Sequence, residues 1–265
     1  MTPFDRAHAA MEAAPENDAA RLALYDRLAD AELFVLLESE PEGDDITPQL
    51  FATEEGDYVL AFDLEERLTR FTDGPAPYAA LPGRVIAQYL VGEGVGLGVN
   101  LDVAPSAMLL PPEAMEWLTD TLTHTPTEAM GTPVAFHAPA LPPAVLAALL
   151  PAFDAKFSHM AGLASHALLG GVSYQDGRRG HVLAFLGAAP KSEPALAKAV
   201  AEALVFSGLE AGEIDVTFLT PEDPAAAVLL DKALVLALPE PIEERAQILT
   251  PAAPGMDPTK PPILR

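Results

Sequence analysis

GVGLGVNL, residues 94–101, is the most informative stretch of this 265-residue sequence. Apolar residues alternate here with glycine and then asparagine, which is the period-two pattern of a β-strand with one apolar face and one almost bare face. Glycine weakens a strand, so three glycines in alternation indicate that something approaches the bare face closely. From the sequence alone, that neighbour is either another part of the chain or a bound ligand.

The residues on either side of this strand predict more helices and strands. Pro82 begins a helix that ends near Gly92, and a second helix begins at Pro111 and Pro112. Asn17 or Asp18 caps an earlier helix. The other elements expected in this half are strands at 33–38, 49–53, 57–62 and 107–110, with 49–53 and 57–62 as a hairpin, and a short helix capped by Asp63.

The second half of the chain shows the same mixture of patterns. Asp176 and Gly177 mark the turn of a hairpin. The expected strands are 133–138, 163–174, 181–187, 214–219 and 234–238, and the expected helices are 143–157, 192–208 and 224–232. Because both halves combine helices with hairpins, we predict an α+β fold of two consecutive domains, each a mixed sheet with packed helices.

Domain boundaries follow from the connecting segments. LTHTPTEAMGT, residues 122–132, has no apolar period and mixes Thr, Pro and Gly, as interdomain connections do. We therefore place the first domain at residues 1–125 and the second at 132–240. Residues 241–265 are rich in proline and are expected to form an extended C-terminal tail.

Composition excludes several classes of protein. With 39 Asp and Glu against 15 Lys and Arg, the net charge of -24 repels nucleic acid. The absence of cysteine excludes disulfides, thiolate metal sites and a cysteine nucleophile. The start of the chain lacks the pattern of a secretory signal, and prolines or polar residues interrupt the two long uncharged segments. We therefore expect a cytoplasmic protein that does not span a membrane.

Two segments resemble a known family. YVLAFDLEERL, residues 58–68, and LPGRVIAQYLVGEGVGLGVNLDVAPSAMLLPPEAMEWL, residues 81–118, are similar to the N-terminal domain of the SseB family, the enhanced serine sensitivity proteins (SseB, enhanced serine sensitivity protein B) of bacteria. The matching positions are Phe62, Glu65, Glu66, Leu68, Gly96, Leu97, Asn100 and Leu109. Where the family often continues its Asn with Pro-Gly, this chain has Leu101 and Asp102.

The resemblance covers roughly residues 17–125, with a weaker match of the second half to the family's C-terminal domain. It implies a two-domain α+β protein of the bacterial cytoplasm. It also implies no catalytic residues, because the family has no established biochemical activity.

Few residues stand out as site candidates. Arg84 is the only Lys or Arg between Arg70 and Lys156, so it either bridges nearby carboxylates or binds an anionic ligand or a partner's carboxylate near Asn100. Together with the bare strand face, this makes a set of candidate residues for ligand or partner binding. The set is Arg84, Gly96, Gly98 and Asn100.

No residues are predicted to be catalytic, to bind a metal or to hold a cofactor. The chain has no G-x-S-x-G motif, and Ser106, Ser158 and Ser173 lie in no activating context. The histidines are expected to be exposed or hydrogen-bonded rather than metal ligands. They are His8, His124, His137, His159, His166 and His181.

Good folding patterns without a reactive combination favour a non-catalytic binding or regulatory protein that acts through protein–protein contacts. The acidic first domain would present a surface to an unidentified protein partner, and the second would assist or form a homodimer. Nucleic acid and membrane partners are not expected. The alternative is a small-ligand sensor or an unrecognised enzyme linked to amino-acid (serine) metabolism, which the bare glycine face and the family name suggest.

Overall fold

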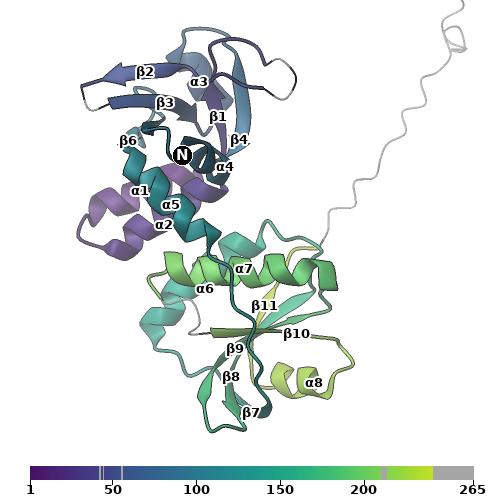
Figure 1. Cartoon of the computed structure of the whole chain (residues 1–265). Helices are drawn as coiled ribbons and strands as arrows, with labels where there is room; N and C mark the ends of the chain where they lie inside the picture. The colour runs from purple at the N-terminus through teal and green to yellow at the C-terminus, as the bar shows by residue number, and fades with distance from the viewer. Residues whose placement is uncertain (42, 44, 55, 210–213, 241–265) are drawn as a thin grey trace, which may run out of the picture.

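The chain folds into two regions, each built on a sheet, as Figure 1 shows. The computed structural model describes residues 1–240 except residues 42, 44, 55 and 210–213, so the predicted Pro-rich tail lies outside the described residues. We call residues 1–123 the N-terminal region and residues 133–240 the C-terminal region. The mixed sheets with packed helices confirm the predicted α+β class.

A mixed sheet forms the centre of the N-terminal region. Its strands are β1 (Glu32–Leu36), β2 (Leu50–Thr53), β3 (Gly56–Phe62), β4 (Tyr78–Pro82), β5 (Val95–Val99) and β6 (Met108–Leu110). The order is β4-β1-β3-β5-β6, and β2 pairs with β3. β3 and β5 run parallel, while the predicted hairpin is present as the antiparallel pair β2 and β3.

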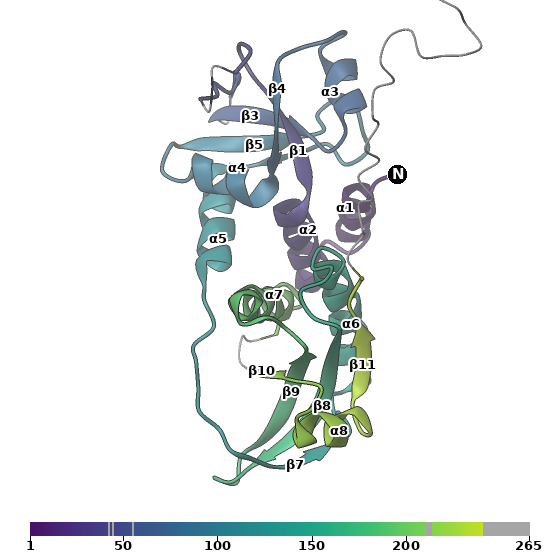
Figure 2. The ribbon, with the colours of Figure 1, turned by 90° about the vertical axis from the view of Figure 1, so that its right-hand side faces the viewer.

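Helices cover both faces of this sheet (Figure 2). They are α1 (Pro3–Ala13), α2 (Asp18–Asp30), α3 (Glu65–Phe71), α4 (Gly83–Leu90) and α5 (Pro112–Thr123). α2, α4 and α5 bury apolar residues against one face, α1 packs beside α2, and α3 covers the other face. The core therefore lies on both sides of the sheet, with the larger cluster beneath α2, α4 and α5.

The helix starts agree only partly with the sequence. Asn17 caps α2 through a hydrogen bond that its side chain accepts from the Ala19 N–H. The prediction that Asp63 caps α3 was wrong, because Leu64 occupies the N-cap and Asp63 accepts a hydrogen bond from Arg67 instead. The sequence analysis also missed α1 and β4.

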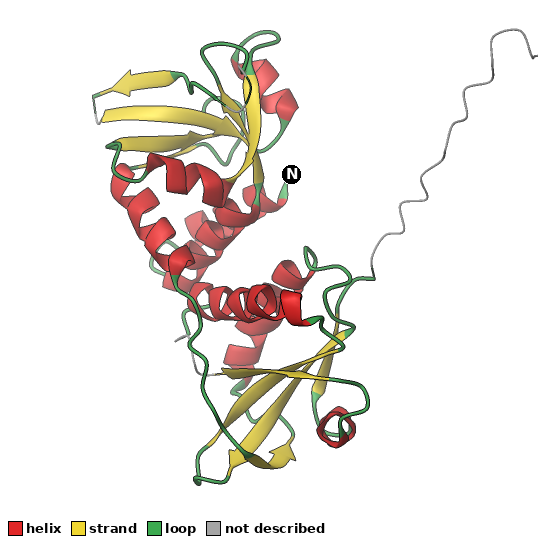
Figure 3. Cartoon of the chain, turned by 45° about the vertical axis from the view of Figure 1, so that its right-hand side comes forward, coloured by secondary structure: helices red, strands yellow, loops and turns green. Residues whose placement is uncertain are grey.

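The C-terminal region is a second sheet with helices on both faces (Figure 3). Its strands are β7 (Pro133–His137), β8 (His166–Tyr174), β9 (Arg179–Leu186), β10 (Ile214–Leu219) and β11 (Leu234–Ala237). Its helices are α6 (Pro143–Phe157), η1 (Pro190–Ser192), α7 (Glu193–Phe206) and α8 (Pro224–Leu230). The order is β10-β9-β8-β11, with β7 also paired to β8 and with β9 and β10 parallel. α6 and α7 pack on one face and α8 on the other.

The two regions share apolar contacts. Phe206, at the end of α7, is buried in the core cluster of the N-terminal region. Trp117 on α5, the single tryptophan, lies between Tyr25 and Phe206, with ring centroids 5.0 and 6.3 Å away. α7 also packs against α2. The regions are thus held together by side chains as well as by the connection between α5 and β7.

Candidate functional site

Arg84 is held by carboxylates from both regions. It lies on α4 and donates a hydrogen bond to Asp30 at the end of α2. It also donates to both carboxylate oxygens of Glu202 on α7, each at 3.1 Å. The fork of a guanidinium fits two carboxylate oxygens at once. Arg84 thus bridges two carboxylates, one of them from the other region.

Lys156 completes what we call the interface cluster, which consists of Asp26, Asp30, Arg84, Lys156 and Glu202. Its side chain is 3% exposed, and Nζ lies 2.7 Å from both Asp26 and Asp30 and 2.9 Å from Glu202. Lys156 comes from α6 and Glu202 from α7, whereas the other three come from α2 and α4. The cluster therefore fixes the C-terminal region against the N-terminal region.

The carboxylates of the interface cluster do not share one environment. Burial would raise the pKa of Glu202, but the hydrogen bonds from Arg84 and the charge of Lys156 lower it overall. The pKa of Asp30 is lowered by Lys156 and Arg84 against the same effect of burial. Burial dominates at Asp26 and raises its pKa despite Lys156. Asp26 is thus the cluster carboxylate most easily protonated.

Asn100 belongs to a second network, which we call the α1 cluster. Its members are Asp5, Asp63, Arg67, Asn100 and Ser106. Asn100 follows β5 with φ 53°, and its Oδ1 accepts from the Asp63 N–H at 3.1 Å while Nδ2 donates to Ser106 Oγ at 3.0 Å. Asparagine tolerates this left-handed conformation. Asn100 is fully buried, and both ends of its side-chain amide have partners within the chain.

The remainder of the α1 cluster attaches the first helix to the sheet. Ser106 Oγ donates to Asp5 at 2.6 Å. Arg67 on α3 contacts Asp5 at 2.6 Å and Asp63 at 2.7 Å. Hydrogen bonds from Arg67 hold the pKa of Asp5 well below its ordinary range. Asp5 also pairs with Thr2 in a capping box, so one carboxylate both starts α1 and fixes it.

The bare face of β5 is filled by the chain itself. A Cβ added at Gly96 would lie 2.5 Å from the ring of Tyr58 and 2.6 Å from the carbonyl oxygen of Leu110. At Gly98 it would lie 2.6 Å from Leu60. These glycines thus let side chains of the adjacent strand pack closely. The four candidate residues occupy three separate environments, namely the interface cluster, the α1 cluster and this packed face.

One serine and one histidine meet on the second sheet. His137 Nε2 and Ser173 Oγ are 3.0 Å apart on the neighbouring strands β7 and β8. A serine nucleophile also needs a group that orients the histidine and donors that stabilise an oxyanion. His137 is exposed, and Ser173 lies within a strand. The pair is a surface hydrogen bond in the geometry seen here.

Neither a metal-ligand cluster nor a membrane-spanning helix is found among the described residues. They contain no group of three or more His, Asp or Glu residues placed to hold a metal ion. Within the same ranges, no helix is both long and apolar enough to cross a membrane.

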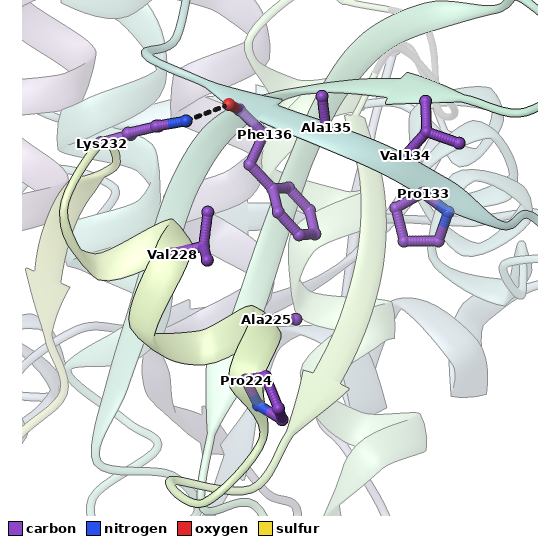
Figure 4. A pocket seen from close by; sticks show the side chains of 8 residues that line it. All are labelled: Pro133, Val134, Ala135, Phe136, Pro224, Ala225, Val228 and Lys232. Atoms are coloured by element: carbon purple, nitrogen blue, oxygen red, sulfur yellow. Dashed lines mark hydrogen bonds between the residues drawn. The ribbon is translucent and has the colours of Figure 1, made fainter.

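A shallow groove between β7 and α8 is the candidate functional site (Figure 4). Its volume is about 390 Å³, and its lining is apolar apart from one cation. The lining residues are Pro133, Val134, Ala135, Phe136, Pro224, Ala225, Val228 and Lys232. Val134 is 62% exposed and Val228 46% exposed, and they come from the two walls. The sequence analysis placed β7 and α8 but missed the groove, because the two walls lie about 90 residues apart in the chain.

Lys232 closes one end of the groove. Its Nζ donates a hydrogen bond to the carbonyl oxygen of Phe136 at 2.9 Å. The side chain of Phe136 lies on the face of the sheet that α8 covers. An exposed apolar channel with one cation offers contact area and one charged hydrogen bond, which suits binding rather than bond-breaking chemistry.

Comparison with known proteins gives one match. Residues 7–117 match the family model of the SseB protein N-terminal domain. No curated protein and no solved structure matches the chain. The match covers α2 to β6, most of α1 and the first half of α5, including the whole sheet of the N-terminal region. The N-terminal region is therefore similar to the SseB protein N-terminal domain, as predicted, and the match ends at residue 117, before the C-terminal region.

Proposed function

We propose that this protein is a non-catalytic binding or regulatory protein of the bacterial cytoplasm that contacts a partner protein. The observation that carries the proposal is the groove between β7 and α8, which exposes apolar side chains beside a single lysine. Exposed apolar patches on soluble proteins are commonly interaction sites.

The ionisable groups of the two clusters support a non-catalytic function, because they pair with one another. The carboxylates, arginines and lysine of the interface and α1 clusters bond to one another. A catalytic acid or base needs to reach a substrate. These paired groups instead stabilise the fold, and the apolar groove is an open surface feature that can contact a partner.

The structure removes the main structural reason for the alternative function, a small-ligand sensor or enzyme. A small-ligand sensor or enzyme of amino-acid metabolism was suggested by the bare glycine face of β5. Tyr58 and Leu60 fill that face. The packed face of β5 therefore leaves no space for a ligand between Tyr58, Leu60 and the two glycines.

The test compares partner binding with ligand binding and turnover. The full chain is used as bait for cross-linking and affinity capture, and each captured protein is purified and titrated by calorimetry. We expect saturable binding of a purified protein and no thermal stabilisation by amino acids or nucleotides, since a ligand of the native state must stabilise it. Turnover in a substrate screen, or a saturable shift with L-serine and no protein partner, would contradict the proposal.

A further inference from the structure

We infer that the groove between β7 and α8 binds an extended segment of a partner protein, which adds a strand to the free edge of β7 and places a carboxylate on Lys232. This inference rests on the proposed function and names the chemistry of the partner. The carboxylate is a Glu or Asp side chain of that segment.

The free edge of β7 supplies the backbone part of the site. β7 pairs with β8 on one side, and no other described strand pairs with it. On the groove side, the Phe136 carbonyl accepts its hydrogen bond from the side chain of Lys232. An edge strand beside a helix can accept a peptide strand whose backbone pairs with the edge and whose side chains enter the groove.

The two walls select apolar side chains. Val228 on α8 is exposed, and the half-buried Phe136 of β7 points toward α8, where it packs with the fully buried Ala226 and Leu229 (Figure 4). A segment in extended conformation points every second side chain to the same face. Apolar residues at alternating positions of the partner would therefore cover Val228 and Phe136.

Charge selects an acidic group at one end. The groove lining contains Lys232 and no carboxylate, although the chain has 39 Asp and Glu. Lys232 now donates to a neutral carbonyl oxygen, and a hydrogen bond to a carboxylate is roughly twice as strong. A carboxylate at this end would be a stronger acceptor for Lys232 than the Phe136 carbonyl oxygen. Lys232 is exposed, so the ion pair would form at the surface.

The edge itself favours a short segment over a second copy of this chain. Pro133 has no N–H to donate, and the register of β7 shifts between Pro133 and Ala135. Both features limit long edge-to-edge pairing between sheets. A few residues of a peptide can still pair beyond the irregularity, beside Phe136.

The test uses a displayed library of random peptides about 12 residues long, which is enough for one strand. One arm displays free C-termini and the other internal segments, so that the two sources of the carboxylate are distinguished. The bait is the full chain, and the selected peptides are synthesised and titrated. We expect alternating apolar residues with an acidic side chain at one end from both arms, and binding that requires a free C-terminus would contradict the inference.

Three variants locate the binding. Val228→Asp should weaken binding by more than about tenfold, because it places a charge in the apolar channel. Lys232→Glu should weaken it several-fold and should bind better the peptide whose acidic residue is replaced by lysine. Leu230→Asp is the matched control, since Leu230 is 45% exposed on the same helix but does not line the groove. Thermal melting shows that each variant is folded.

Every other outcome overturns the inference. Failure to select peptides, or peptides that bind Val228→Asp and Lys232→Glu as well as the unchanged chain, would place recognition elsewhere. Self-association abolished by Val228→Asp would assign the groove to a second copy. Competition by a synthetic peptide of residues 241–265 would assign it to the chain's own terminus. The proposed function would survive these results if a purified protein partner still bound the full chain saturably.

Discussion

The two buried ionic clusters are alike in charge but differ in what they connect. The α1 cluster has two carboxylates around Arg67, and the interface cluster has three around Arg84 and Lys156, so each contains one carboxylate more than it has cations. All partners of Arg67 lie in the N-terminal region, whereas Lys156 and Glu202 come from the other region. The first cluster therefore fixes a helix on its sheet, and the second fixes one region against the other.

The largest effect is expected at Lys156. In Lys156→Met, the buried Asp26 and Glu202 and the half-buried Asp30 keep Arg84 as their remaining cluster cation. Removing one partner of a buried charge pair costs about 3–5 kcal/mol of unfolding free energy. The measurement is urea unfolding followed by circular dichroism. Fluorescence of Trp117, which contacts Phe206 across the interface, should change at lower urea than the circular dichroism.

Lys191→Met is the matched control for this variant, because Lys191 is exposed. Its effect should stay within about 0.5 kcal/mol, as for most surface substitutions. A similarly small loss in Lys156→Met would show that the interface cluster does not hold the regions together.

The α1 cluster should give a smaller and more local loss. Arg67→Met leaves Asp5 and Asp63 without their cation, and we expect a loss of about 2–3 kcal/mol because Arg67 keeps some contact with solvent. Hydrogen exchange should accelerate in α1, while Trp117 fluorescence should not separate from circular dichroism. Arg70→Met on the same helix is the control. If Trp117 fluorescence changed at lower urea than circular dichroism in Arg67→Met, the α1 cluster would also hold the two regions together, and the two clusters would not differ in this role.

The sequence predicts elements better than it predicts these clusters, for a physical reason. β5 and the hairpin of β8 and β9 depend on alternation and on turn residues such as Asp176 and Gly177, which are local. The local signature of α1 is also present in the sequence, since Thr2 and Asp5 form a capping box and the helix buries Phe4 and His8 on one face.

The clusters and the groove have no such local signature. Arg84 and Glu202 are 118 residues apart, and no periodicity relates them. The sequence identified Arg84 as an unusual cation and bridging as one of its roles, but its partner could come only from the packing of α7 against α2. The groove likewise depends on how α8 packs beside the edge of β7.

A third prediction concerns pH. The pKa values of Asp5, Asp30 and Glu202 are lowered in the folded protein. Their contribution to stability is complete above the pKa values of the unfolded chain, near pH 4, and is lost as the pH falls through the folded values. Unfolding free energy should therefore decrease below about pH 4. Denaturant titrations between neutral and acidic pH measure it.

Glu202→Gln separates the interface cluster from the α1 cluster in this experiment. The variant should be less stable at pH 7 and should lose less stability on acidification, because one of the lowered groups is gone. Glu116→Gln, at an exposed position on α5, serves as the control and should leave the slope unchanged. An unchanged slope in Glu202→Gln would assign the acid sensitivity to Asp5 and Asp30.

The smallest effect should have the opposite sign. Burial raises the pKa of Asp26, so its charged form costs free energy in the folded protein even beside Lys156. Asp26→Asn removes this cost while Asp30 and Glu202 still pair with Lys156. We expect stability at pH 7 to stay constant or rise by at most about 1 kcal/mol, the scale of one neutral hydrogen bond. A loss as large as that of Glu202→Gln would mean that the three carboxylates are equivalent and that the cluster needs all of them ionised.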